Sequence, residues 1–232
     1  MTDNLNRRRF LETAGAVAAG ALAGAASSAK AAEEPAKAAG GKVKILAFSG
    51  SHRKGKTTAA ALKLALDSAA AVSPEIETEL IELCDYKLDF VQPGQPFKDD
   101  FEKLNAKITD PAVGGIILGS PTYFSNMSSM MKVFIEHWGA YKRGFTLSNK
   151  VGGLLAVAGA RNGGQENVIA SMMATLLGME MIVVGDGRPS AHNGATLQNQ
   201  KDDISTDEAG SSTAKALGKR VAEVALKLAG KK

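Results

Sequence analysis

Continuous apolar runs alternate with helix-like segments along most of this chain, and this alternation restricts its fold more than any other feature. The runs at 43–48, 113–120 and 151–159 contain too few polar residues for half-exposed strands, so they predict strands covered on both faces. Shorter strands are predicted at 77–83 and 181–185. The predicted helices lie at 56–71, 98–108, 127–138, 165–177 and 211–229. Strands separated by helices indicate an α/β domain with a five-stranded parallel sheet and right-handed crossovers.

The first 31 residues have the organisation of an export signal rather than of a folded element. Three arginines at 7–9 precede a Phe-Leu pair, a weakly apolar Ala/Gly run covers 14–26, and Ala29–Ala31 has the A-x-A form of a cleavage site. The order resembles a twin-arginine signal. That resemblance implies export of an already folded protein to the periplasm; a disordered basic tail is the alternative.

The predicted organisation is therefore a signal peptide at 1–31, a flexible linker at 32–41 and one domain at 42–232. The Ala/Gly run is too short and too rich in alanine for a stable membrane span. The net charge is +4, and the first 32 residues hold four Lys/Arg against two Asp/Glu, which leaves about +2 for the remainder. That excess is too small to indicate nucleic-acid binding, and the one cysteine, Cys84, permits neither an internal disulfide nor a metal cluster.

In a parallel α/β sheet, ligands bind at the loops that follow the carboxyl ends of the strands. Four segments in such positions are rich in small, polar or charged residues: 50–58, 120–126, 159–166 and 186–196. We therefore expect the functional site at these loops.

The first of these loops, GSHRKGKT at 50–57, predicts a phosphate site. Two glycines allow the backbone to bend around an anion, and the following helix directs its free amide groups to the same place. Side chains add hydroxyls and positive charge from Ser51, Arg53, Lys54, Lys56, Thr57 and Thr58.

The same eight residues match the P-loop pattern G-x-x-x-x-G-K-[ST]. A nucleoside triphosphatase also needs an aspartate that holds magnesium at the end of a second buried strand. The runs ending near 120 and 158 are followed by Ser-Pro-Thr and Gly-Ala-Arg, which supply no carboxylate. A P-loop nucleotide-binding protein therefore remains the weaker alternative.

Three segments together resemble the flavodoxin-like NAD(P)H-dependent FMN reductase and iron–sulfur flavoprotein family. They are FSGSHRKGKTTAAAL from 48, GSPTYFSNMSSMMKVFIEHW from 119 and AGARNGGQENVI from 158. The resemblance implies a flavodoxin-like three-layer sandwich with strand order 2-1-3-4-5 and FMN as the cofactor. His52 departs from the proline that is frequent in relatives, and Cys84 stands alone where the iron–sulfur branch has a cysteine motif.

The resemblance also implies which residues bind FMN. Ser51, Arg53, Thr57 and Thr58 would hold the phosphate, and Lys56 would add positive charge. Pro121, Thr122, Tyr123 and Phe124 would form the wall of the ring site, and Asn126 is predicted to cap the next helix. Ser49, Ser125 and Asn126 complete the predicted cofactor-binding residues of these two loops. The last loop would contribute Gly159, Arg161, Gly163 and Gly164, and Arg161 would face the ring edge where reduced flavin carries negative charge.

We therefore interpret the sequence as an FMN-dependent oxidoreductase without a catalytic side chain or a metal. The donor is NAD(P)H by resemblance, or a quinol or redox protein if the chain is exported, and the acceptor is a quinone, a flavin or another small molecule. Relatives imply a homodimer or homotetramer. A nonenzymatic FMN electron carrier is the other alternative. Among the remaining polar residues, His137 is predicted to be a cation at a helix end or an interface residue, His192 a surface residue and Cys84 a buried one.

Overall fold

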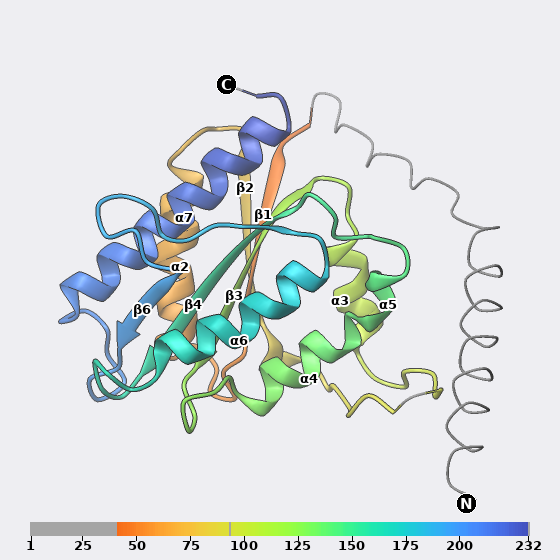
Figure 1. Cartoon of the computed structure of the whole chain (residues 1–232), viewed down its shortest axis with the longest axis horizontal. Coiled ribbons are helices and arrows are strands. Elements are labelled where there is room, and N and C mark those ends of the chain that lie inside the picture. Colours follow the sequence, from red (N-terminus) through yellow and green to blue (C-terminus); the bar gives the residue numbers. More distant parts are fainter. Residues whose placement is uncertain (1–40, 93, 232) are drawn as a thin grey trace, which may run out of the picture. The chain divides into compact units, whose positions relative to one another are not determined.

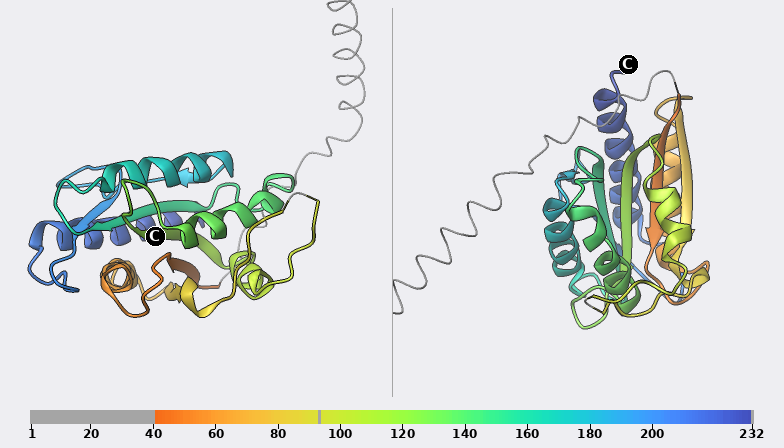
Figure 2. Two further views of the ribbon diagram at one scale, coloured as in Figure 1. Left: turned by 90° about the horizontal axis from the view of Figure 1, so that it is seen from below. Right: turned by 90° about the vertical axis from the view of Figure 1, so that its right-hand side faces the viewer.

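The computed structural model describes residues 41–92 and 94–231, which form a parallel sheet with helices on both faces (Figures 1 and 2). The predicted signal peptide and all of the predicted linker except Gly41 lie outside the described residues. The boundaries at 31 and 41 therefore stay predictions. None of the described helices is long and apolar enough to cross a membrane.

The strands pair in the order β2-β1-β3-β4-β5, which confirms the predicted order, and β6 also pairs with β4. Every pair of strands is parallel. The strand bounds are Val43–Ser49 for β1, Ile76–Glu82 for β2, Val113–Pro121 for β3, Val151–Ala158 for β4, Ile182–Val183 for β5 and Ala195–Gln198 for β6.

The predicted fifth strand at 181–185 is only partly correct, because two short strands share the edge beside β4. β5 pairs with the start of β4, and β6 pairs with its end, at Leu155–Ala158. Between them the chain leaves the sheet in a loop that the buried Asp186 holds closed, since its carboxylate accepts bonds from the Ser190 hydroxyl and the His192 amide. Residues 195–196, predicted as loop, therefore begin the sixth strand.

Two helices cover one face of the sheet, α2 (Thr57–Ala70) and α7 (Glu208–Leu228). The other face is covered by α3 (Phe101–Ile108), α4 (Ser129–His137) and α6 (Gln165–Gly178). The short helix α5 (Gly139–Lys142) follows α4, and the 3-10 helix η1 (Leu83–Asp85) follows β2.

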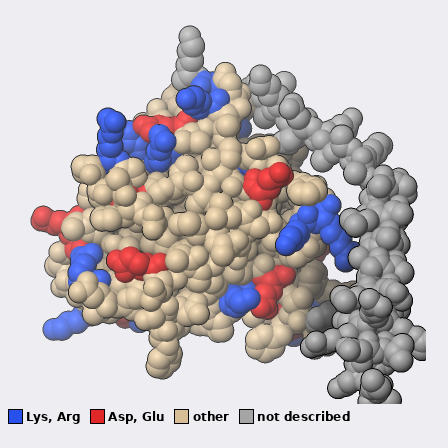
Figure 3. Space-filling model, in the orientation of Figure 1, with Lys and Arg blue, Asp and Glu red and all other residues tan. Residues whose placement is uncertain are grey.

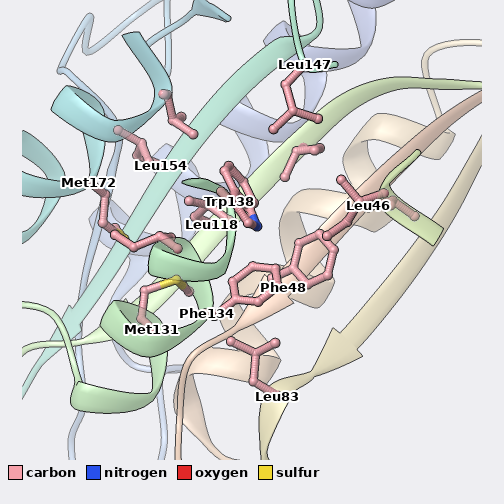
Figure 4. Close-up of a cluster of buried hydrophobic side chains, with 14 of the residues drawn as sticks. Leu46, Phe48, Leu83, Leu118, Met131, Phe134, Trp138, Leu147, Leu154 and Met172 are labelled. Carbon is pink, nitrogen blue, oxygen red and sulfur yellow. The ribbon is translucent and has the colours of Figure 1, made fainter. Parts of the chain in front are cut away.

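Strand β1 shows why its sequence is continuously apolar. Ile45 and Ala47 enter the core beneath α2 and α7, whereas Leu46 and Phe48 enter the core on the opposite face. In the core on that opposite face, the ring centroids of Phe48 and Phe134 lie 4.7 Å apart (Figure 4). Successive side chains of a strand point to opposite faces, so a central strand needs apolar residues at every position.

The helix predicted at 127–138 is observed as α4, which begins at Ser129 and ends at His137. Met131, Phe134 and Trp138 are buried in the core, and Met127 and Met130 are half-buried against it. The helix is capped by Ser128, whose hydroxyl accepts from the Met131 amide at 3.0 Å, so the prediction that Asn126 is the cap was wrong.

His137 lies at the carboxyl end of α4, as predicted, but its side chain is fully buried, so the alternative prediction of an interface residue was wrong. Its Nε2 lies 2.9 Å from a carboxylate oxygen of Asp99 and its Nδ1 lies 2.8 Å from the Val133 carbonyl oxygen. The imidazole therefore ties α4 to the segment that precedes α3.

Candidate functional site: four loops at the carboxyl edge of the sheet

The loops that follow β1, β3, β4 and β6 meet at one edge of the sheet, in the lower part of Figure 1. They enclose a cavity of about 70 Å³. Its lining joins residues from three of the four predicted loops, and from the end of β4, with one from the loop after β6: Ser51, Arg53, Thr57, Thr58, Pro121, Thr122, Tyr123, Val157, Ala158, Gly159 and Asn199. The predicted convergence is therefore confirmed for these three loops, whereas the fourth, at 186–196, contributes no residue to the cavity.

The start of α2 forms the floor of an anion site. Ser51, Thr57 and Thr58 are almost fully buried, and Lys56, the residue that precedes the helix, makes no side-chain capping bond. The first amide groups of a helix have no partners within the helix, and they attract anions together with its dipole. The free amides and the two threonine hydroxyls of α2 therefore suit a phosphate.

The phosphate loop is fixed from outside the cavity. The Gly50 amide donates to the Gly119 carbonyl oxygen at 2.8 Å, and the Gly50 carbonyl accepts from the Ser128 hydroxyl at 2.5 Å. On the far side, the Gly55 amide donates to the Glu82 carboxylate and the Lys54 ammonium to Asp85, both at 2.7 Å. Lys54 is thereby directed away from the cavity.

The two remaining cations of the loop contact a residue that the sequence did not single out. Arg53 donates to an oxygen of the Asp202 carboxylate at 2.6 Å, and the Lys56 ammonium lies 3.4 Å from the other oxygen. The bond from Arg53 is the main cause that lowers the pKa of Asp202, with a smaller contribution from Lys56. The loop after β6 therefore belongs to the site.

The loop between β3 and α4 carries two exposed aromatic residues, Tyr123 and Phe124. Tyr123 and Asn126 exchange two backbone hydrogen bonds, of 2.9 and 3.0 Å, and close a tight turn. Phe124 and Ser125 occupy its central positions with φ of 50° and 59°, a left-handed conformation uncommon for residues other than glycine. The Phe124 side chain is completely exposed, and that of Tyr123 is partly exposed.

The loop between β4 and α6 packs against that turn. Gly164 has φ of 96°, and a Cβ atom there would approach the Ser125 hydroxyl to 2.5 Å, so only glycine fits. The buried Gln165 fixes the loop, since it accepts from the Gly163 amide at 2.9 Å and donates to the Ala160 carbonyl at 2.8 Å.

Arg161 is paired with a carboxylate of its own chain. Its guanidinium donates to Asp207, which is buried and also accepts from the amides of Gln198 and Gly210. Burial raises the pKa of Asp207, but these bonds together hold it below its usual value. Nearly half of the Arg161 side chain remains exposed, at 46%. The guanidinium is therefore positioned by Asp207, a residue the sequence did not single out.

Two buried hydroxyl groups at this edge have no hydrogen-bonding partner in the described part of the chain, Ser49 Oγ and Thr122 Oγ1. A third unpartnered atom, Trp138 Nε1, lies in the core. Buried polar atoms usually have partners. Thr122 follows β3 and lines the cavity, whereas Ser49, the last residue of β1, is not part of its lining. The unpartnered hydroxyl of Thr122 therefore favours a polar ligand in the cavity over an empty structural cavity.

The cavity fits only the smaller part of such a ligand. Sites that enclose a whole small molecule usually measure about 300–1,000 Å³, against about 70 Å³ here. A planar ring system would therefore lie outside the cavity, against the loop with Tyr123 and Phe124. A larger hollow of about 860 Å³ lies elsewhere, between α7 and the loop at 186–191.

No group of three or more His, Cys, Asp or Glu residues is arranged to hold a metal within residues 41–92 and 94–231. Cys84 is half-buried, and burial raises the pKa of its thiol. With one cysteine in the whole sequence, the chain cannot supply the four thiolates of an iron–sulfur cluster.

Comparison with known proteins agrees with this geometry. Residues 43–196 match the family of NADPH-dependent FMN reductases. An iron–sulfur flavoprotein of Methanocaldococcus jannaschii is 39% identical over 191 residues, which cover 78% of this chain and 97% of that protein. An iron–sulfur flavoprotein of Methanosarcina thermophila is 34% identical over 182 residues, which cover 75% of this chain and 93% of that protein. An NAD(P)H dehydrogenase (quinone) of Paracoccus denitrificans is 44% identical over 70 residues, which cover 30% of this chain and 34% of that protein.

Solved structures share the fold at low sequence identity. A WrbA-like flavodoxin from Agrobacterium tumefaciens superposes with a TM-score of 0.57 at 17% identity, covering 80% of this chain and 98% of that one. RosB with a bound riboflavin phosphate derivative superposes with a TM-score of 0.61 at 18% identity, covering 80% of both chains. The fold is therefore flavodoxin-like.

The family match and the loops at the sheet edge lead to one conclusion about the chemistry. The chain binds FMN and is a flavin-dependent oxidoreductase. It belongs to the NADPH-dependent FMN reductase family.

Proposed function

We propose that this protein is an exported FMN oxidoreductase that takes electrons from a quinol or a redox protein and passes them to a quinone, a flavin or another small acceptor. FMN itself supplies the transfer of electrons or hydride. The chain's own residues bind the cofactor, orient it and set the charge around it. NAD(P)H is the alternative donor, supported by the name of the family and of the relative from Paracoccus denitrificans.

One observation carries the assignment of the cofactor site. The uncapped start of α2 and the buried hydroxyls of Ser51, Thr57 and Thr58 line the same small cavity, beside the unpartnered hydroxyl of Thr122. This arrangement offers several hydrogen-bond donors to one phosphate. Tyr123 and Phe124 are exposed at the rim and would pack against the ring. Arg161 would supply positive charge near the ring edge.

The proposed donor follows from the proposed location. The arginines at 7–9, the Ala/Gly run and the A-x-A segment support export of the folded protein by the twin-arginine pathway, with FMN already bound. Nicotinamide nucleotides belong to the cytosol, so a protein exported in this way would leave that reductant behind. Quinols and redox proteins are the donors that remain available outside the inner membrane.

We also propose that the protein forms a homodimer or homotetramer through the exposed face of α6. This face consists mainly of small and apolar side chains, with Ala170, Ala174 and Leu177 exposed and Met173 half-exposed. It lies at the front of Figure 1, and the same area is largely free of charge in Figure 3. Light scattering after gel filtration tests this proposal, because Leu177→Glu should yield monomers that retain FMN.

The absorbance spectrum of the purified protein tests for FMN, and anaerobic stopped-flow reduction tests the donor. NADH, NADPH and a soluble quinol are mixed with the protein in parallel, and we expect fast, saturable reduction by the quinol alone. Turnover with a quinone as acceptor would separate an enzyme from a nonenzymatic electron carrier. Cell fractionation should place the protein in the periplasm. Saturable reduction by a nicotinamide, with recovery from the cytosol, would contradict both donor and location.

A further inference from the structure

The loop after β6 presents one carboxylate to the phosphate loop. Asn199 anchors it, since its amide donates to the Ala158 carbonyl at 2.7 Å and its side chain accepts from the Asp202 amide at 2.8 Å. Gln200 and Asp203 then exchange two backbone hydrogen bonds, of 2.8 and 3.1 Å, around Lys201 and Asp202. Asp202 therefore sits at the tip of a two-residue turn.

The backbone of this turn is strained. Lys201 and Asp202 have φ of 56° and 66°, so two successive residues with Cβ atoms are left-handed. Turns of this kind favour Asn-Gly or Asp-Gly, because both central positions need positive φ. Aspartate tolerates this conformation, but lysine adopts it less readily. The tip of this turn contacts Arg53 and Lys56 through the Asp202 carboxylate.

That contact occupies the cations assigned to the cofactor. Asp202 bonds Arg53 at 2.6 Å and lies 3.4 Å from Lys56, while Lys54 is held by Asp85. All three cations of the phosphate loop are thus paired with carboxylates in this structure. A phosphate monoester near neutral pH carries about −1.5 to −2 charges, more than the single charge of a carboxylate, so it can replace Asp202.

We propose that Asp202 is a displaceable substitute for the cofactor's phosphate, and that its displacement sets how strongly the protein prefers FMN to riboflavin. The inference rests on the proposal that Arg53 and Lys56 hold the phosphate of FMN. When FMN binds, its phosphate takes the two cations and the strained turn moves away. Riboflavin has no phosphate, leaves the contact in place and gains nothing from these cations.

The test compares the wild type with Asp202→Asn, after removal of bound flavin. Asparagine also tolerates a left-handed backbone, so the turn can keep its shape. Asp67→Asn is the matched control, since Asp67 pairs with Lys63 on the exposed face of α2 and lies outside the site. Dissociation constants for FMN and riboflavin are measured separately by quenching of flavin fluorescence.

We expect Asp202→Asn to bind FMN about tenfold more tightly, with riboflavin binding changed less than about twofold. Asp67→Asn should change neither constant. In an Arg53→Ala background the effect of Asp202→Asn should be much smaller, because most of the competition is for Arg53.

Three outcomes would overturn the inference. An unchanged ratio of FMN to riboflavin affinity would show that Asp202 does not compete with the phosphate. Weaker FMN binding by Asp202→Asn would show that the carboxylate orients Arg53 instead. A wild-type protein that binds riboflavin as tightly as FMN, or neither of them, would remove the phosphate assignment itself and the inference with it.

Discussion

Replacement of Gly218 by alanine should destabilise the domain, although alanine is the better helix former. Gly218 lies in α7 where this helix crosses α2 on the same face of the sheet. A Cβ atom at this position would lie 1.8 Å from the carbonyl oxygen of Ala65 and 2.5 Å from its carbonyl carbon. The obstacle is backbone, which cannot rotate away as a long side chain can, so the two helices would have to separate.

Two opposing effects set the size of the change. Alanine gains about 0.8–1.0 kcal/mol over glycine in a helix interior. Overpacking in a core costs about 1–3 kcal/mol, and we take the upper end because the contact is with backbone. The free energy of unfolding should therefore fall by about 2 kcal/mol. In a domain of this size, each kcal/mol of lost stability lowers the midpoint of thermal unfolding by about 2–4 °C. The midpoint should therefore fall by about 4–8 °C.

Thermal unfolding of the flavin-free protein, followed by circular dichroism, measures this change. Gly139→Ala is the control, because a Cβ atom there would meet nothing within 4 Å. It should shift the unfolding free energy by no more than about 0.5 kcal/mol. If Gly218→Ala melted at or above the wild-type temperature, the argument from close helix approach would be refuted.

Three further predictions concern the site and the pH dependence of stability. The double variant Arg53→Ala, Thr58→Ala should weaken FMN binding by at least about a hundredfold, from two lost charge-assisted bonds, and unchanged flavin content after gel filtration would contradict the phosphate assignment. Redox titration should give a lower two-electron potential for Arg161→Ala, because the reduced flavin loses a nearby cation. The potential should be higher for Asp207→Asn, which removes the negative charge paired with Arg161. An unchanged potential in Arg161→Ala would mean that the side chain does not face the ring. The bond from Lys44 lowers the pKa of Asp110, so its stabilisation is present above the unfolded pKa of about 3.9 and is lost as pH falls through the lower folded value. Asp110→Asn should therefore lose less stability on acidification below about pH 5 than the wild type does, which acid titration at fixed urea concentration measures.

The fold class and the edge of the sheet where the site lies could both be predicted from the sequence alone. The apolar runs of β1, β3 and β4 indicate burial on both faces, since every position of a central strand meets a helix layer. Glycine, serine and threonine after each run marked the loops that line the cavity. These signals are local, so they can be read without knowledge of the rest of the chain.

Which side chains meet across these loops could not be predicted before the chain segments were placed in three dimensions. Asp202 lies 149 positions from Arg53, and Asp207 lies 46 positions from Arg161. Both aspartates come from the loop after β6, a four-residue strand too short to give a clear pattern. His137 likewise found a buried partner in Asp99, 38 positions away. Charged residues in loops carry no periodic signal of burial or pairing, because their partners depend on how distant segments come together when the sheet forms.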